Sequence, residues 1–122
     1  MSFLGVRSLA AAVVVVGLMA ASWGAQAADF IVKGTGLDGA AYQGRVATDV
    51  VGDTVKVVWL VDGARYVGNG VIYDNALAVY FTGPTTGVAI YKYDTATGVW
   101  RGRWTTAGAN KAGTEDWIPV NR

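Results

Sequence analysis

The sequence predicts an all-β domain of about eight short antiparallel strands. Apolar and polar residues alternate with a period of two in several stretches, and pairs of Asp, Asn and Gly residues that favour tight turns separate them. No long stretch carries apolar residues at the helical spacing of 3.6. Short connections favour antiparallel neighbours, so we expect a meander that closes into a small up-and-down β-barrel, with a two-sheet sandwich as the alternative.

Residues 1–27 have the layout of a cleaved secretory signal peptide. Arg7 precedes an apolar run from Leu9 to Ala21, and a small-residue A-x-A cleavage motif ends at Ala27. The apolar run is shorter than the roughly 20 residues that a membrane-spanning helix needs, so we expect cleavage rather than retention as an anchor. The sequence therefore predicts an exported protein, periplasmic or secreted, whose residues 28–122 form a single β domain without a membrane span.

The strands follow from the alternation and the turns, taken in order. The expected strands cover residues 30–35, 42–48, 54–61, 64–73, 76–81, 88–93, 99–105 and 114–120. Asp62-Gly63 is the strongest hairpin signal, because both residue types tolerate a positive φ. The longer breaks fall at residues 83–87 and 106–113.

The alternation assigns large rings and glycines to the same inner face. The expected inward set is Tyr42, Trp59, Tyr66, Trp100, Trp104 and Trp117, with Gly44, Gly68, Gly70 and Gly102. Residues 38–44 and 62–68 share a D-G-A-x-Y-x-G pattern, in which a ring can cover the hollow above a neighbouring glycine. A second tyrosine set is expected to lie partly outward, where it would suit protein recognition: Tyr73, Tyr80, Tyr91 and Tyr93.

Most common catalytic designs are excluded by composition. The chain has no Cys and no His, and residues 28–122 contain no Ser, so neither a Ser-His-Asp triad nor an imidazole or thiolate metal site can form. Glu115 is the only glutamate, and the adjacent Asp116 should point to the opposite face of a strand. We therefore expect no enzymatic activity, no metal site and no cofactor.

Asp38, Asp53, Asp62 and Asp74 occupy positions where turns favour Asp, and Glu115 is the exception. It alternates with Trp117, which should face inward, so we expect the Glu115 side chain to enter the end of the barrel. A buried carboxylate needs a partner such as an arginine. We favour structural pairing of Glu115 over contact with a ligand.

The segment 100–104, W-R-G-R-W, interleaves aromatic and basic residues as in some nucleic-acid-binding surfaces. On a strand, however, Trp100 and Trp104 face one side while Arg101 and Arg103 face the other. Without Arg7, basic and acidic residues balance at nine each, so the domain has no overall attraction for nucleic acid. We expect core tryptophans, solvated arginines and no nucleic-acid partner.

Nearly the whole of residues 28–122 resembles a family of small exported proteins, found mainly in alphaproteobacteria and sometimes labelled fibronectin-binding. The resemblance rests on D-G-x-x-Y-x-G at 38–44, V-x-W at 57–59, G-x-x-Y-x-G-x-G at 63–70, L-A-V at 77–79, G-x-A-x-Y at 87–91, G-x-W-x-G-x-W at 98–104 and G-T-E at 113–115. It implies no catalytic residue. The strand pattern is also similar to that of calycin-type barrels such as avidins, an analogy of fold only.

These observations lead to a non-enzymatic exported binding protein. Our first expectation is a protein-binding module of the cell envelope or extracellular space. The alternative is a barrel that carries a small apolar or aromatic ligand. The candidate ligand- or partner-binding residues are Trp59, Tyr66, Trp100, Trp104, Trp117, Glu115, Tyr91 and Tyr93.

Overall fold

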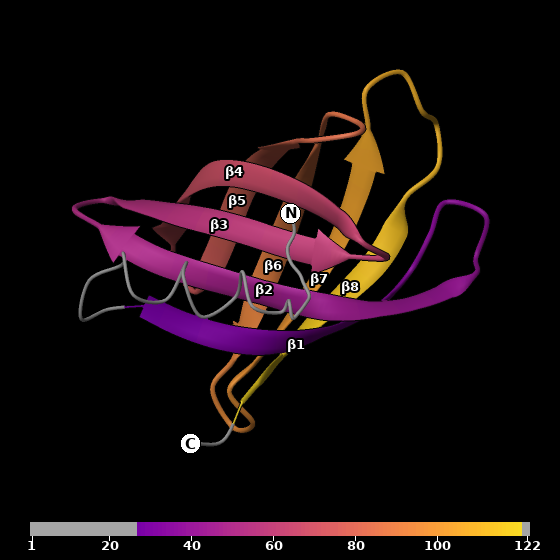
Figure 1. Cartoon of the computed structure of the whole chain (residues 1–122). Coiled ribbons are helices and arrows are strands. Elements are labelled where there is room, and N and C mark those ends of the chain that lie inside the picture. The colour runs from indigo at the N-terminus through magenta and orange to yellow at the C-terminus, as the bar shows by residue number, and fades with distance from the viewer. Residues whose placement is uncertain (1–26, 121–122) are drawn as a thin grey trace.

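The computed structural model describes residues 27–120 and shows a closed antiparallel barrel of eight strands (Figure 1). The strands are β1 (Ala27–Thr35), β2 (Ala41–Val51), β3 (Thr54–Val61), β4 (Ala64–Tyr73), β5 (Ala76–Thr82), β6 (Gly87–Asp94), β7 (Val99–Thr106) and β8 (Gly113–Pro119). Each strand pairs with the next, and β8 pairs with β1, which closes the barrel and removes exposed edges. The predicted up-and-down barrel is confirmed, and the sandwich alternative is wrong.

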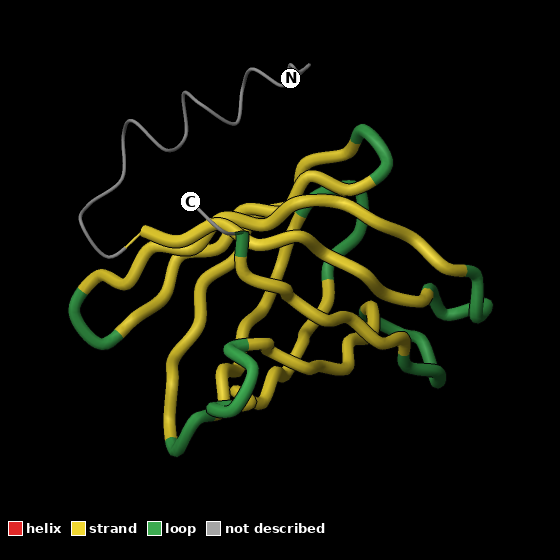
Figure 2. The backbone as a smooth tube through the Cα atoms, turned by 90° about the horizontal axis from the view of Figure 1, so that it is seen from below, coloured by secondary structure: helices red, strands yellow, loops and turns green. Residues whose placement is uncertain are grey.

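The strands of the two halves of the barrel run in different directions. In Figure 1, β2 and β3 cross β5, β6 and β7 at a steep angle, and Figure 2 shows the same closed wall from below. No helix capable of crossing a membrane is found within residues 27–120. The expected signal peptide lies almost wholly outside the described residues. Cleavage after Ala27 would remove one residue from the start of β1.

Tight turns set the register of the hairpins. Asp62 and Gly63 both have positive φ, at 51° and 75°, and so do Asp74 and Asn75, at 52° and 61°. A positive φ at both central residues defines the type I′ turn, whose twist matches that of antiparallel strands. The Asp62-Gly63 hairpin is therefore confirmed, in register with Val61 opposite Ala64.

Apolar side chains fill one end of the barrel. The core combines small and medium aliphatic side chains with large rings, and Val32, Val57, Leu77 and Trp117 are each at most 1% exposed. At that end Trp100 packs against both Trp117 and Tyr93, with ring centroids 6.5 and 4.8 Å apart. The open space of the barrel therefore lies at the other end, beyond Trp117.

Strand β6 corrects one prediction. Tyr91 was expected to lie partly outward, but it is 1% exposed and faces the interior with Gly87 and Ala89. The larger aliphatic residues Val88 and Ile90 face solvent instead. Gly87 and Ala89 are small because rings of neighbouring strands, such as Phe81 beside Gly87, already fill the space. The large aliphatic residues of β6 therefore indicate the wrong face.

Candidate functional site

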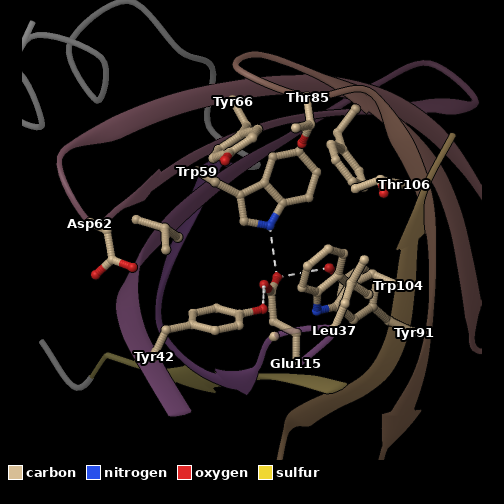
Figure 3. A pocket seen from close by; sticks show the side chains of 13 residues that line it. Leu37, Tyr42, Trp59, Asp62, Tyr66, Thr85, Tyr91, Trp104, Thr106 and Glu115 are labelled. Carbon is tan, nitrogen blue, oxygen red and sulfur yellow. Dashed lines mark hydrogen bonds between the residues drawn. The ribbon is translucent and has the colours of Figure 1, made fainter. Parts of the chain in front are cut away.

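A cavity of about 360 Å³ opens at the end of the barrel where the loops leave β1, β3, β5 and β7. Figure 3 shows aromatic side chains around it, with the carboxylate of Glu115 among them. The lining includes six aromatic residues, namely Tyr42, Trp59, Tyr66, Phe81, Tyr91 and Trp104. Leu37, Val61, Asp62, Thr85 and Thr106 contribute at the loops and strand ends of the same mouth. The cavity is therefore an aromatic cup that opens at one end of the closed barrel.

The rings form a connected wall. Tyr66 contacts Phe81 with centroids 5.9 Å apart, and Phe81 contacts Trp104 at 6.3 Å. Trp104 in turn contacts Tyr42 at 6.3 Å. All three contacts are edge-on, with interplanar angles of 72–82°, which is a favourable geometry for aromatic pairs.

Glycines on adjacent strands, and Gly83 just after β5, leave the space that these rings occupy. A Cβ on Gly102 would lie 2.6 Å from Cε2 of Tyr91, and a Cβ on Gly87 would lie 2.6 Å from Cζ of Phe81. Equivalent collisions would occur between Gly34 and Tyr42, Gly83 and Tyr66, and Gly113 and Trp104. Each ring thus occupies space that any side chain at the glycine would take. This arrangement orients the wall before any ligand arrives.

Glu115 lies at the floor of the cavity, on β8, and is 5% exposed. Its Oε2 accepts hydrogen bonds from Nε1 of Trp59 (2.8 Å), the hydroxyl of Tyr91 (2.8 Å) and Nε1 of Trp117 (2.7 Å). Its Oε1 accepts one from the hydroxyl of Tyr42 at 2.6 Å. Three strands, β2, β3 and β6, therefore direct donors at one carboxylate, in addition to β8, which carries Glu115 and Trp117.

The predicted burial of Glu115 is confirmed, but its expected arginine partner is wrong. Its partners are two tyrosines and two tryptophans, and the salt bridges found among residues 27–120 join Arg101 to Asp94 and Asp116. Hydrogen bonds to a charged group are worth about 1.5–3 kcal/mol each, so four of them offset the cost of burying the carboxylate without a cation. Arginine is unnecessary because indole and phenol groups donate from within the aromatic core.

The carboxylate changes the acidity of its neighbours. Burial, followed by the negative charge of Glu115, raises the pKa of Tyr91 well above its ordinary value. The same two causes, in the same order, raise the pKa of Tyr42. Both phenols therefore remain protonated donors through the neutral range.

The candidate residues named from sequence fall into two groups. Trp59, Tyr66, Tyr91, Trp104 and Glu115 all line the cavity, and Trp117 supports its floor by donating to Glu115. Trp100 and Tyr93 lie together at the opposite end of the barrel and do not contribute to the lining. Sequence reasoning assigned Tyr42 to the interior but not to the site, although its place in the D-G-A-x-Y-x-G repeat was a usable signal.

The fold and the site define a small antiparallel barrel with an aromatic cavity at one mouth and a buried carboxylate on its floor. Comparison of the chain with models of protein families, with curated proteins and with solved structures found no match. The function is therefore inferred from the geometry of the cavity.

Proposed function

We propose that this barrel binds a small organic ligand in its aromatic mouth and performs no chemistry on it. The observation that carries the proposal is the cavity, whose volume of about 360 Å³ falls in the range of known ligand pockets, about 300–1,000 Å³. Such pockets combine mostly apolar walls with a few placed polar groups. Here the rings supply the walls and Glu115 supplies the polar group.

A binding role fits the state of Glu115 better than a catalytic one. A general acid or base must be available to exchange a proton with a substrate. Both oxygens of Glu115 already accept hydrogen bonds, three of them at Oε2. The barrel thus offers a rigid, preformed receptor, and we favour the ligand-carrier alternative over the protein-binding expectation.

The first test is uptake of N-phenyl-1-naphthylamine, an uncharged aromatic dye whose fluorescence rises in apolar surroundings. We expect saturable binding to the protein and its loss in Thr85→Trp, since Thr85 lines the mouth and an indole there would occupy it. Thr82→Trp is the matched control, because Thr82 is exposed on β5 and does not line the cavity. Equal binding by both variants would overturn the proposal.

A second test concerns the protein as its own cell makes it. Native mass spectrometry of the exported protein, purified without denaturation from periplasm or culture medium, would report any bound small molecule together with the intact mass. We expect an adduct that Thr85→Trp does not retain. A wild-type protein that carries no adduct and also fails to bind the dye would contradict the carrier role.

One observation favours protein recognition as a second candidate function. On the outer face of β4, β5 and β6, Tyr73, Tyr80, Val88 and Ile90 are 80%, 54%, 56% and 51% exposed. Tyr80 lies directly opposite Val88 in the strand register, so the apolar groups are contiguous there. Exposed apolar patches that contain tyrosine are typical of interaction sites.

A matched pair of variants tests whether a protein partner binds this face. Val88 lies in the patch and is 56% exposed, whereas Val51, at the end of β2, is 47% exposed. If a protein partner docks on this face, cross-linking to that partner in envelope extracts should be lost in Val88→Asp and kept in Val51→Asp. The same cross-links in both variants would remove the patch from consideration.

A further inference from the structure

The charges around the cavity have one sign. Glu115 lies on the floor and Asp62 lies at the rim, in the tight turn between β3 and β4. No lysine or arginine is among the described residues that line the cavity. Glu115 also takes part in none of the salt bridges found within residues 27–120. Low-dielectric walls around charges of one sign focus their field, so the cup attracts positive charge and repels negative charge.

The hydrogen-bond donors of the cavity are largely engaged. Nε1 of Trp59 and the hydroxyls of Tyr42 and Tyr91 all point to Glu115. Nε1 of Trp104 donates to the backbone carbonyl oxygen of Thr114 at 3.3 Å. An anionic ligand, which needs several donors, would therefore meet a carboxylate and donors that are already in use. This arrangement disfavours carboxylates, sulfates and phosphates as ligands.

The acceptor capacity of Glu115 is unevenly used. Oε2 receives three donors, which saturates it, while Oε1 receives the hydroxyl of Tyr42 alone. A carboxylate oxygen accepts about two hydrogen bonds, so Oε1 retains room for one more donor. Oε1 is thus the oxygen that can face the positively charged group of a ligand, with or without an N–H donor.

The aromatic wall also favours a positively charged ligand. Rings of Trp and Tyr attract cations to their faces, and cups of such rings bind organic ammonium groups. This cavity holds six aromatic residues. Inorganic cations prefer oxygen ligands, and no group of three His, Cys, Asp or Glu side chains suited to a metal was found among residues 27–120. A positive charge on an apolar body therefore fits this cavity better than a metal ion does.

We propose that the ligand of this cavity is an organic ammonium ion, a substituted amine whose apolar groups contact the rings and whose charge is balanced by Glu115 and Asp62. This inference rests on the proposed ligand-binding function and names its ligand class. The positive charge enters between the rings, and Glu115 attracts it from the floor. Asp62 adds a weaker, solvent-screened attraction at the rim.

The test uses three probes with one benzyl body and different head groups. Benzyltrimethylammonium carries a cation, neopentylbenzene is its neutral isostere, and phenylmethanesulfonate carries an anion. Binding is followed by the fluorescence of the tryptophans, of which Trp59 and Trp104 line the cavity. We expect the cation to bind at least 10-fold more tightly than the neutral probe and the anion not to bind measurably.

The outcomes separate this inference from the proposed function. Tighter or equal binding of the neutral probe would overturn the ammonium proposal and leave the ligand-binding function intact. If none of the three probes binds and the uncharged naphthylamine dye also fails, the proposed function fails with it.

Two aspartate variants test the charge without disturbing the fold. Asp62→Asn removes the rim charge and keeps a residue that tolerates the φ of 51°. Asp74→Asn makes the same change in the corresponding turn between β4 and β5, at the opposite end of the barrel, where φ is 52°. We expect a 2- to 5-fold loss of cation affinity at low salt for Asp62→Asn alone, with neutral-probe affinity unchanged. Equal effects of the two variants would contradict a role for the rim carboxylate.

Discussion

The hydroxyl of Tyr42 donates a 2.6 Å hydrogen bond to Oε1 of Glu115, although 73 residues separate them in the chain. The bond joins β2 to β8 across β1, which pairs with both strands. Trp59 and Tyr91 bring β3 and β6 to the same carboxylate. Glu115 therefore links strands around most of the barrel, and its loss should affect stability as well as the cavity.

The Glu115→Gln variant tests that structural role. Glutamine offers one carbonyl oxygen to four donors, and its amide N–H groups would face other donors. Leaving buried donors without acceptors costs about 1–3 kcal/mol for each group. We expect the free energy of unfolding, measured by urea denaturation, to fall by about 3 kcal/mol.

Asp116→Asn is the control for that measurement. Asp116 is the next residue but faces outward, where it forms a 3.1 Å salt bridge with Arg101, whose side chain is 54% exposed. Exposed ion pairs contribute at most about 1 kcal/mol, so this variant should lose little stability. Similar losses in the two variants would show that Glu115 does not hold the barrel together.

The two buried phenols predict a loss of stability at alkaline pH. Burial and the charge of Glu115 raise the pKa of Tyr91 and of Tyr42 above the ordinary value of about 10. Above pH 10 the unfolded chain therefore loses protons that the folded protein keeps. The free energy of unfolding must then decrease as pH rises, by about 1.4 kcal/mol per pH unit from Tyr91.

Ultraviolet absorbance of tyrosinate and circular dichroism would follow this transition together. We expect part of the tyrosinate signal to appear only when the barrel unfolds, because Tyr91 is 1% exposed. In the Tyr42→Phe/Tyr91→Phe double variant that cooperative part should vanish and the pH dependence above 10 should flatten. Gradual ionisation of all tyrosines in a folded barrel would contradict the prediction.

Most of the strands could be predicted from sequence because period-2 alternation reports directly which residues face inward. Strand β3 keeps the predicted bounds, with Val55, Val57 and Trp59 all buried. Strand β6 could not be assigned to the correct face, since its inner positions are Gly87, Ala89 and Tyr91. The small size of Gly87 and Ala89 follows from the rings of Phe81 on β5 and Trp104 on β7, which strand pairing brings beside them.

The site was harder to predict from the sequence than the fold. Alternation placed Glu115 inside with Trp117, but the identity of its partners depends on which residues of other strands reach the same depth. The hydroxyls of Tyr42 and Tyr91 meet Glu115 because of the pairing registers of β2 and β6 in the barrel, and a single sequence does not reveal those registers. The glycine pairing also differs in detail from the expectation, because Val61, not a ring, fills the space above Gly44.

The proposal that the protein is exported predicts a defined mature N-terminus. Cleavage after Ala27 would leave Ala28 as the first residue, still paired with Thr48 of β2. Intact mass measurement of the protein from its own periplasm or medium should therefore correspond to residues 28–122. A mass that retains residues 1–27 would contradict cleavage and indicate a tethered domain.

The contact between Gly102 and Tyr91 predicts a specific coupling. The two residues lie directly opposite each other on β7 and β6, and a Cβ at Gly102 would lie 2.6 Å from Cε2 of the Tyr91 ring. Gly102→Ala must therefore displace the ring and weaken its hydrogen bond to Glu115. Overpacking of this kind costs about 1–3 kcal/mol.

A double-mutant cycle with Tyr91→Leu isolates this clash. Leucine removes the ring that the alanine methyl group would meet, so Gly102→Ala should cost far less stability in the Tyr91→Leu background than in the wild type. The expected coupling, from urea denaturation of all four proteins, is at least about 1 kcal/mol, within the range for residues in contact. If the two losses of stability simply add, Gly102 is required by the backbone of β7 and not by the Tyr91 ring. The contact between Gly102 and Tyr91 would then not be what orients that ring in the cavity wall.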